Sequence, residues 1–390
     1  MNDPFACAAE VRLKPGRDAS VRRHHPWVYR GALAGPAPAG AAPVRVTAAN
    51  GRPLGTALPG GSGSLALRMV AFADERWDAA ALRARLLAAA ALRQRLALDA
   101  DAYRVVHAEG DGLPGLVLDR YGDTFVCQPF AAAWEPLLPA VVATLTAELG
   151  AAAVLRRGGD AAGEATVLHG RAPVGEVVIR EGGVRFAVDV INGQKTGFFL
   201  DQRENRRRVA ALARGASLLN LFSYSGGFAV TALAAGARRA VNVDASAAAL
   251  ELARRAYALN GLAVDGADFV AADAFRIVRA LGAAGERFGA VVVDPPAFVK
   301  RPADLEAGLR GYKDIHLHAM RLAEPGGWLL ACSCSALVSE AEFGAMLAAA
   351  ALDAGRELRV VDRRGAGPDH PVSPHCPEAA HLKAWLCAVN

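Results

Sequence analysis

Two short polar segments in the C-terminal half of the chain carry residues that can do chemistry. An Asp-Pro-Pro sequence beginning at Asp294 follows the apolar run 290–293, and a Ser-Cys-Ser sequence centred on Cys334 follows the run 328–331. Such runs predict buried strands, and ligands in an open α/β sheet bind where the strands end. A carboxylate there can hydrogen-bond the edge of a planar base while a thiol attacks its ring. The pair therefore predicts covalent chemistry on a nucleobase.

A glycine turn and further strand-end carboxylates predict the site of a second ligand. Segment 218–228 is a predicted strand that enters a glycine turn, where the backbone can approach a ligand closely. It lacks the G-x-G-x-x-G pattern, so a nucleoside-type cofactor fits better than NAD. Asp244 is placed to hold ribose hydroxyls and Asp273 to bond an adenine amino group. A single strand-end aspartate is more often a helix N-cap, so the prediction depends on the combination. The candidate residues are Asn220, Phe222, Ser223, Ser225, Gly226, Asp244, Asp273, Ala274 and Asp294.

Length and composition set the class of protein. A chain of 390 residues predicts two or three domains, and 53% apolar with 21% charged residues is typical of a globular protein. No apolar stretch is long enough and free enough of charge to predict a membrane span, and no secretory signal is visible. The six cysteines are scattered, which favours a reduced, cytoplasmic protein over a disulfide framework.

Positive charge is concentrated near the N-terminus. Residues 1–70 hold nine Lys and Arg against three Asp and Glu, a net +6, whereas the whole chain carries +5. A basic segment of this kind is expected where a protein touches phosphates, and this predicts nucleic-acid binding. The alternative is a solvated arginine-rich face.

The pattern of apolar and turn-forming residues predicts the elements that position these sites. Strand-like pieces at 10–13, 43–47 and 65–70 lie between Gly/Pro-rich turns, which favours a small β-barrel. A helix is predicted over 78–97, followed by a mixed α+β stretch to about residue 183. From residue 218 onward strands alternate with helices, as in a parallel sheet with crossover helices.

Several long segments carry a resemblance to a known family. The chain resembles class I S-adenosylmethionine-dependent methyltransferases and, more closely, the bacterial 23S rRNA cytosine-C5 methyltransferase I family. Besides the motifs above, the likeness covers the segments 17–29, 109–115, 192–203, 369–372 and 382–383. It implies an α/β fold: a Rossmann-like class I methyltransferase domain at 186–390, an N-terminal PUA β-barrel at 1–73 and a central α+β domain at 74–185.

The resemblance also implies ligands and partners. S-adenosyl-L-methionine is the expected cofactor and 23S rRNA the expected substrate, bound through the PUA domain. Segment 192–203 is expected to close over the cofactor, with Phe198 and Phe199 packing on it and Asp201 or Lys195 supplying a polar contact; alternatively it only packs between domains. His370, His375, Cys376 and His381 match no zinc spacing, so no metal is expected. A homodimer is considered. The residues expected at the RNA are Lys14, Arg17, Arg22, Arg23 and Trp27.

Within the family pattern, Cys334 is the expected nucleophile. Its thiolate would add to C6 of cytosine, so that C5 becomes able to attack a methyl group, while Asp294 holds the base. Cys332 is expected in the core. Ala297 stands where two-cysteine enzymes carry a second cysteine, so a single-cysteine scheme is predicted, and the base that removes the C5 proton is not identified. Methylation of a nitrogen and a non-catalytic RNA-binding assembly role are the alternatives. Cys334→Ala separates the first of these, because an N-methyltransferase should keep its activity.

Overall fold

The computed structural model describes residues 3–61, 63–158 and 165–390. The chain divides into two compact units. The first holds the chain up to Val177 together with Asp189–Phe198 and Pro368–Ala379, and the second holds Val178–Val188, Phe199–Gly367 and Ala380–Asn390. The three-domain division at residues 73 and 185 remains a prediction. No helix among the described residues is long and apolar enough to cross a membrane.

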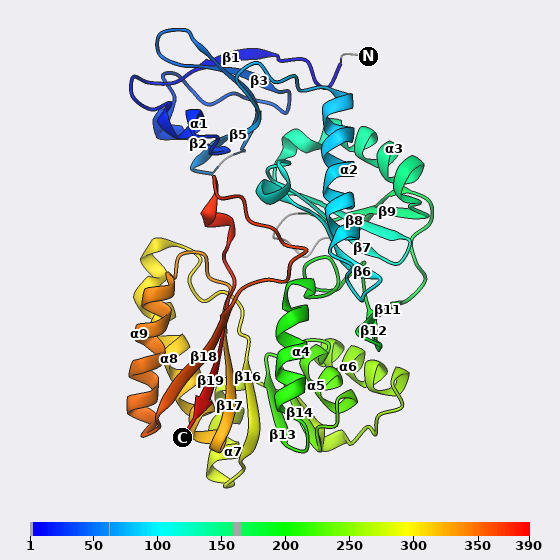
Figure 1. The fold of residues 1–390 in the computed structure, drawn as a ribbon, viewed down its shortest axis with the longest axis vertical. Helices are drawn as coiled ribbons and strands as arrows, with labels where there is room; N and C mark the ends of the chain where they lie inside the picture. Colours follow the sequence, from blue (N-terminus) through cyan, green and yellow to red (C-terminus); the bar gives the residue numbers. More distant parts are fainter. Residues whose placement is uncertain (1–2, 62, 159–164) are drawn as a thin grey trace. The chain divides into compact units, whose positions relative to one another are not determined.

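The N-terminal part of the first unit is a five-stranded sheet with strand order β1-β3-β4-β5-β2 (Figure 1). Apolar side chains such as Leu13, Val46 and Leu67 form its core. A small β-barrel was predicted here, and the structure shows a small domain built on one five-stranded sheet. Strands β2 and β4 were not predicted, because β2 is only three residues long and β4 begins and ends with proline. The elements are β1 (Ala9–Arg12), α1 (Ala19–Arg22), β2 (Trp27–Tyr29), β3 (Val44–Thr47), β4 (Pro53–Pro59) and β5 (Leu65–Phe72).

A second sheet of the first unit has strand order β10-β9-β8-β7-β6 and carries two helices. The predicted helix over 78–97 is confirmed: it starts after Asp78, whose side chain accepts a hydrogen bond from the N–H of Ala81 at 2.9 Å. The elements are α2 (Ala79–Arg95), β6 (Ala102–His107), β7 (Leu116–Tyr121), β8 (Thr124–Pro129), α3 (Leu138–Leu149), β9 (Ala153–Arg156) and β10 (Thr166–His169).

Segment 109–115 connects the two sheets of the first unit. The Glu109 carboxylate accepts hydrogen bonds from the Trp27 indole and from Arg68 of the N-terminal sheet, each at 2.8 Å. The next residue, Gly110, lies so close to the C-terminal segment that a Cβ there would be 1.9 Å from the carbonyl oxygen of Pro371. The segment therefore has a structural role that its sequence alone did not reveal.

The second unit contains a seven-stranded sheet with strand order β15-β14-β13-β16-β17-β19-β18 (Figure 1). Strands β13 to β17 are parallel, and β19 pairs antiparallel with both β17 and β18. The strand order reverses between β13 and β16, and ligands bind at such a switch point. The elements are β12 (Val184–Val188), which pairs with β11 (Val177–Glu181), then α4 (Arg203–Leu212), β13 (Ser217–Leu221), α5 (Gly227–Ala234), β14 (Arg239–Asp244), α6 (Ala247–Leu259), β15 (Phe269–Ala271), α7 (Ala274–Ala283), β16 (Phe288–Val293), α8 (Leu305–Leu322), β17 (Ala323–Ser333), α9 (Glu340–Ala354), β18 (Leu358–Arg364) and β19 (Lys383–Val389).

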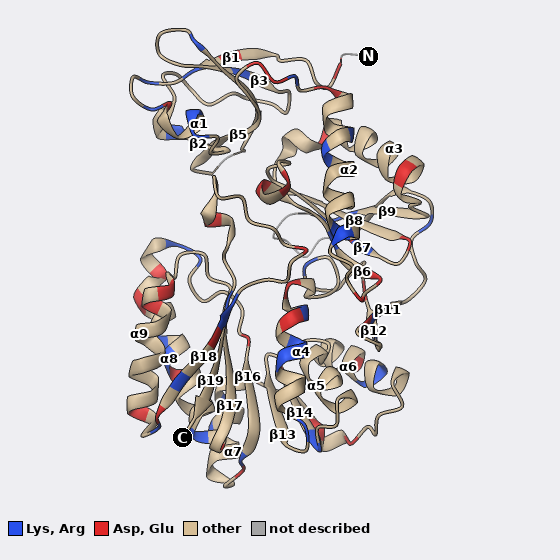
Figure 2. Cartoon of the chain, viewed as in Figure 1, with Lys and Arg blue, Asp and Glu red and all other residues tan. Residues whose placement is uncertain are grey.

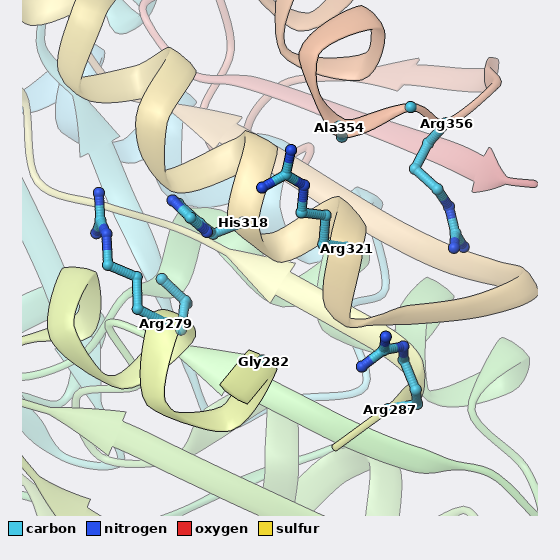
Figure 3. Close-up of a pocket in the computed structure, with 9 residues that line it drawn as sticks. Arg279, Gly282, Arg287, His318, Arg321, Ala354 and Arg356 are labelled. Atoms are coloured by element: carbon cyan, nitrogen blue, oxygen red, sulfur yellow. The ribbon is translucent and has the colours of Figure 1, made fainter. Parts of the chain in front are cut away.

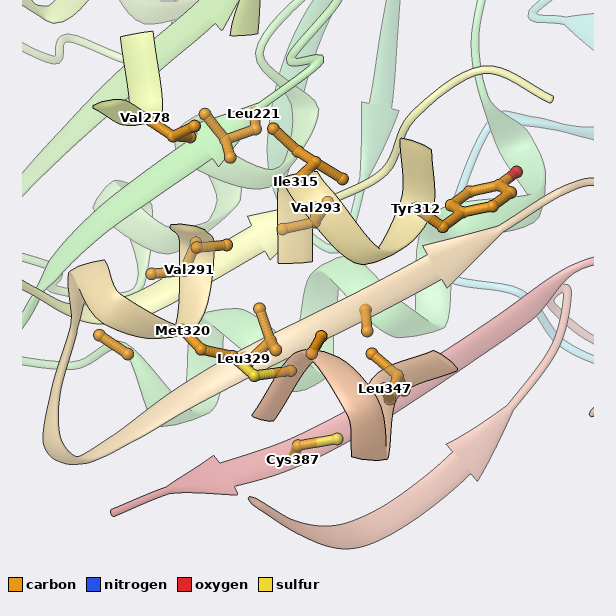
Figure 4. Packing of buried hydrophobic residues seen from close by; sticks show 14 of the residues in the cluster. Leu221, Val278, Val291, Val293, Tyr312, Ile315, Met320, Leu329, Leu347 and Cys387 are labelled. Carbon is orange, nitrogen blue, oxygen red and sulfur yellow. The ribbon is translucent and has the colours of Figure 1, made fainter. Parts of the chain in front are cut away.

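Helices cover both faces of this sheet, with α7, α8 and α9 packed side by side on one face. Figure 4 shows the core between them: Val291 and Leu329 of the sheet meet Ile315 and Met320 of α8 and Leu347 of α9. Each such side chain contributes about 1.5–3 kcal/mol when fully buried. The predicted α/β architecture with crossover helices is confirmed, and this core holds the ends of β16 and β17 in place.

Candidate active site at the carboxyl ends of the parallel strands

Asp294 and Cys334 follow adjacent strands. Val293, the last residue of β16, pairs with Ala331 of β17, and β17 ends at Ser333. The sulfur of the half-buried Cys334 lies 3.8 Å from the carbonyl oxygen of Pro295. The structure therefore brings together the two residues that the sequence proposed for catalysis.

A buried tyrosine and a serine fix the loop that follows β16. The Ser335 hydroxyl accepts a hydrogen bond from the N–H of Val299 at 3.2 Å, and the Tyr312 hydroxyl of α8 lies 2.8 Å from the same oxygen. Burial raises the pKa of Tyr312, so its hydroxyl keeps its proton and can donate. This arrangement ties the Asp-Pro-Pro loop to the residue next to Cys334.

Lys383 places a buried positive charge beside the thiol. It pairs with Ser333 across β17 and β19, and its ammonium donates to the carbonyl oxygens of Ser335 at 3.1 Å and His381 at 2.9 Å. Burial lowers the pKa of Lys383, and the nearby Cys334 is the largest of the charges that raise it. A neighbouring ammonium favours a thiolate, so Lys383 can activate Cys334. Sequence reasoning assigned Lys383 no role beyond its place in the matched segment 382–383.

Cys332 has a different environment. It is fully buried in the sheet, and burial raises its pKa well above the ordinary value for a thiol, with Asp294 adding to the effect. The prediction that Cys332 belongs to the core is confirmed. Cys334 is the more accessible of the pair, and it adjoins Ser335, whose carbonyl oxygen accepts from the Lys383 ammonium.

Two amides that the sequence did not single out orient Asp294. The Gln202 amide donates to the Asp294 carboxylate at 2.9 Å, and Asn205 donates to the carbonyl oxygen of the Gln202 side chain at 2.6 Å. Both amides are buried. Gln202 belongs to the matched segment 192–203, which was the only sequence signal for it.

The glycine turn after β13 has the backbone of a ligand-binding loop. Phe222 and Tyr224 have φ of 57° and 46°, and Gly226 has 73°. Such conformations in residues other than glycine are uncommon and concentrate at functional sites. At Gly226, a Cβ would meet the Cβ of Ala253 at 2.8 Å, so glycine is required there. The turn is therefore held in a strained conformation by its surroundings.

Unsatisfied polar atoms in this turn fit a polar ligand. The buried hydroxyls of Ser223 and Ser225 and the buried side-chain oxygen of Asn220 have no hydrogen-bond partner within the described part of the chain. Such atoms are costly unless a water or a ligand completes them. The carboxylate of Asp244 accepts from the N–H groups of Tyr224 and Ser246, each at 2.8 Å, and its remaining lone pairs suit ribose hydroxyls.

Asp273 caps helix α7, which is one of the two roles considered for it; the other, a contact with the cofactor, remains a prediction. Its carboxylate accepts from the N–H of Arg276 at 3.0 Å at the start of α7, where Ala274 is buried. The ring of Phe275 lies 6.4 Å from that of Phe222 and 5.9 Å from that of Phe298. These aromatic rings connect the ends of β13, β15 and β16, so an apolar wall lies beside the polar turn.

The two remaining cofactor candidates fall in different units. Phe199 belongs to the second unit, and its ring lies 5.3 Å from that of Tyr224 in the glycine turn. The carbonyl of Phe199 accepts from Arg206 at 2.8 Å, and Arg206 in turn forms a buried ion pair with Glu181. Lys195 belongs to the first unit, so its contact with a cofactor remains a prediction.

The residues expected at RNA lie on the N-terminal sheet domain, and α1 carries visible basic positions (Figure 2). Lys14, Arg17, Arg22 and Arg23 are exposed, and Arg22 pairs with Asp18 at 3.1 Å. Trp27 is partly buried, with its indole N–H held by Glu109.

His25, Cys376 and Glu378 cluster in the first unit at distances that a metal ion would allow. However, Nδ1 of His25 accepts from the N–H of Trp27 at 3.1 Å, which places the ring proton on Nε2. Nε2 then donates to Glu378 at 3.3 Å and has no lone pair for a metal. The geometry describes a hydrogen-bonded group.

Comparison with known proteins agrees with these features. Residues 138–388 match the S-adenosylmethionine-dependent methyltransferase family, and residues 11–72 match the PUA-like domain. A ribosomal RNA large subunit methyltransferase I from Shewanella denitrificans is 39% identical, covering 98% of this chain and 100% of the relative. One from Photobacterium profundum is 38% identical, covering 97% and 99%.

Solved structures share the fold over almost the whole chain. A Streptococcus mutans protein proposed to be a SAM-dependent methyltransferase superimposes with a TM-score of 0.86 at 18% identity, covering 97% of this chain and 100% of that one. Another proposed methyltransferase, complexed with SAH, gives a TM-score of 0.85 with the same coverage. The chain therefore belongs to the S-adenosylmethionine-dependent methyltransferases, and within them to the family of the ribosomal RNA large subunit methyltransferase I proteins.

Proposed function

We propose that the protein methylates C5 of a cytosine in 23S ribosomal RNA through a covalent adduct with Cys334. The observation that carries the proposal is the placement of Cys334 next to the Asp294 loop and beside the buried ammonium of Lys383. A nitrogen methyltransferase has no use for a thiol activated in this way. The names of the relatives support large-subunit ribosomal RNA as the substrate. With such a substrate, we also propose a cytoplasmic location.

The cofactor would be held by the residues around the glycine turn. Asn220, Ser223 and Ser225 offer buried polar atoms, and Asp244 offers a carboxylate for the ribose. Phe222 and Gly226 shape the turn, and the ring of Phe199 lies against that of Tyr224 in it. Asp273, Ala274 and Lys195 belong to the same proposed set of cofactor contacts. When bound, S-adenosylmethionine supplies an electrophilic methyl group on its sulfonium sulfur.

The residues of the chain account for the other steps. The target cytosine must leave its stack to reach the strand ends. Cys334, as a thiolate, forms a bond to C6 and makes C5 nucleophilic. Asp294, held by Gln202, accepts a hydrogen bond from the base edge and stabilises it as the adduct forms. After methylation C5 loses its proton and the sulfur leaves C6, which restores the aromatic ring and the free thiol.

The N-terminal domain would bind the RNA. Lys14, Arg17, Arg22 and Arg23 are exposed cations that can neutralise phosphates, and Trp27 has a partly exposed ring that Glu109 holds in place. We assign this role to a PUA domain at 1–73, with the central domain at 74–185 and the methyltransferase domain at 186–390. The match of residues 11–72 to the PUA-like domain supports the first of these boundaries.

Mass mapping of methylated 23S rRNA tests the proposal. The wild-type protein should add one methyl group to a cytosine ring carbon, Cys334→Ala should add none, and the matched control Cys332→Ala should remain active because Cys332 lies in the core. Full activity of Cys334→Ala would instead indicate nitrogen methylation. No methylation by the wild type would indicate an assembly role.

A trapping experiment tests the adduct itself. In RNA containing 5-fluorocytosine, C5 carries no proton to lose, so the covalent complex should persist and a peptide containing Cys334 should carry the base. The Cys334→Ala protein should form no such complex with the same RNA.

A further inference from the structure

A second site lies at the opposite edge of the same sheet. A cavity of about 550 Å³ is lined by α7, by α8, by the end of α9 and the segment after it, and by the residue before β16. Its polar lining consists of Arg279, Arg287, His318, Arg321 and Arg356, and none of its lining residues is acidic (Figure 3). We call this cavity the arginine pocket. Because it lies near the amino ends of β16 and β17, it is separate from the edge that carries Asp294 and Cys334.

Most of the arginine charge in the pocket is not neutralised. Arg279 pairs with Asp314 at 2.7 Å. Across the described chain, Arg287, Arg321 and Arg356 form no ion pair with a carboxylate. Their guanidinium groups donate to the backbone carbonyls of Glu286 at 2.7 Å, Asp353 at 2.7 Å and Ala323 at 2.8 Å, respectively. Three guanidinium groups therefore keep full positive charge and unused donors around one cavity.

Two of the residues whose backbone carbonyls hold these arginines carry acidic side chains, and both carboxylates already have partners. Lys313 holds the Asp353 carboxylate at 2.6 Å, and Arg239 lies 3.8 Å from the Glu286 carboxylate. In addition, the Nε of Arg356 is buried and lacks a hydrogen-bond partner within the described residues. A buried donor of this kind is costly, and an acceptor from a ligand would satisfy it.

The positive charges that line the pocket repel one another. Burial lowers the pKa of Arg356, and the charge of Arg287 lowers it further. Burial also lowers the pKa of His318, and Arg279 and Arg321 add to that effect while Asp314 opposes it. A bound anion would relieve this repulsion. Guanidinium groups match phosphate oxygens in paired hydrogen bonds, so phosphate is the favoured anion.

The size of the cavity decides the kind of phosphate ligand. Its volume falls within the range of roughly 300–1,000 Å³ typical of small-molecule sites, whereas a single phosphate would fill little of it. Cations from four segments of the chain can contact several phosphate groups at once. We propose that the arginine pocket binds an anion with two or more phosphate groups. A free polyphosphate, a nucleotide and consecutive phosphates of an RNA backbone share this chemistry.

Calorimetric titration of the full-length protein with inorganic tripolyphosphate tests the proposal at low ionic strength. Arg287→Gln and Arg356→Gln should each weaken binding about tenfold or more, since each removes a charged hydrogen-bonding group. The matched control is Arg207→Gln, which removes an exposed arginine of α4 that lies outside the pocket and pairs with Glu204. It should bind as the wild type does. Because Arg287 is exposed, its variant should fold even if Arg356→Gln does not.

Competition then identifies the source of the phosphates. If ATP displaces tripolyphosphate from the wild type, the pocket accepts nucleotides; if a short single-stranded RNA displaces it, the pocket accepts an RNA backbone. If neither competes, the ligand is a free polyphosphate. The proposal is overturned if tripolyphosphate does not bind, or if Arg287→Gln binds it as tightly as the wild type does.

Discussion

His316 should make the second unit sensitive to mild acid. This side chain is fully buried on α8, between the rings of Tyr312 at 6.4 Å and Phe343 at 6.0 Å. Its Nδ1 donates to the carbonyl of Tyr312 at 2.7 Å, and Nε2 has no partner within the described part of the protein. Burial lowers the pKa of His316 from the ordinary 6.5 to about 4. The residue is therefore neutral in the folded protein.

The sign and size of the effect follow from this pKa. Between the folded value of about 4 and the unfolded value of 6.5, the unfolded chain binds more protons, so the free energy of unfolding rises with pH. The stability present above the unfolded pKa is lost as pH falls toward the folded pKa. At 1.36 kcal/mol per pKa unit, acidification from about pH 7.5 to about pH 5 should cost about 2 kcal/mol from this group alone.

The assay compares two proteins so that all other titrating groups cancel. His316→Asn keeps a side-chain N–H that can reach the Tyr312 carbonyl but cannot take up a proton. Urea unfolding should be followed by tryptophan fluorescence, to which Trp328 and Trp385 of the second unit contribute. We expect the wild type to lose about 2 kcal/mol more than the variant over this pH range. Parallel pH dependences for the two proteins would refute the buried, neutral state of His316.

Three further changes have defined outcomes. Lys383→Met should shift the rising limb of the pH–rate profile for methylation to higher pH by about one unit, because the Cys334 thiolate loses its nearby cation. An unshifted profile would show that Lys383 only supports the fold. Gln202→Met should lower the methylation rate about tenfold or more by releasing Asp294, with little change in thermal stability as the check that folding is intact. Gly110→Ala should lower the free energy of unfolding by about 1–3 kcal/mol, because the added Cβ would clash with Pro371. The control Gly31→Ala should not lower it, since no atom lies near the added Cβ. Equal melting temperatures for the two variants would contradict the packing described.

Local patterns in the sequence predicted a long helix, the parallel strands and the positions of the two catalytic candidates. Apolar periodicity located α2 and the parallel strands, and Asp294 and Cys334 were placed at strand ends from the runs that precede them. Strand β4 was missed because it begins and ends with proline and contains a glycine, residues that are typical of turns. Asp273 was predicted to bind the cofactor; its side chain caps α7, and its contact with a cofactor remains a prediction.

What the sequence by itself determined is the set of reactive residues and their order along the chain. The tertiary structure alone decided what surrounds them. Lys383 is far from Cys334 in sequence, and it reaches the site because β19 pairs antiparallel with β17 in the register that places it opposite Ser333. Gln202 precedes Asp294 by 92 residues, and the fold brings its amide to the Asp294 carboxylate. The arginine pocket likewise combines cations from α7, α8, the residue before β16 and the segment after α9. Strand register and helix packing depend on contacts between distant segments, which no local pattern of residues specifies.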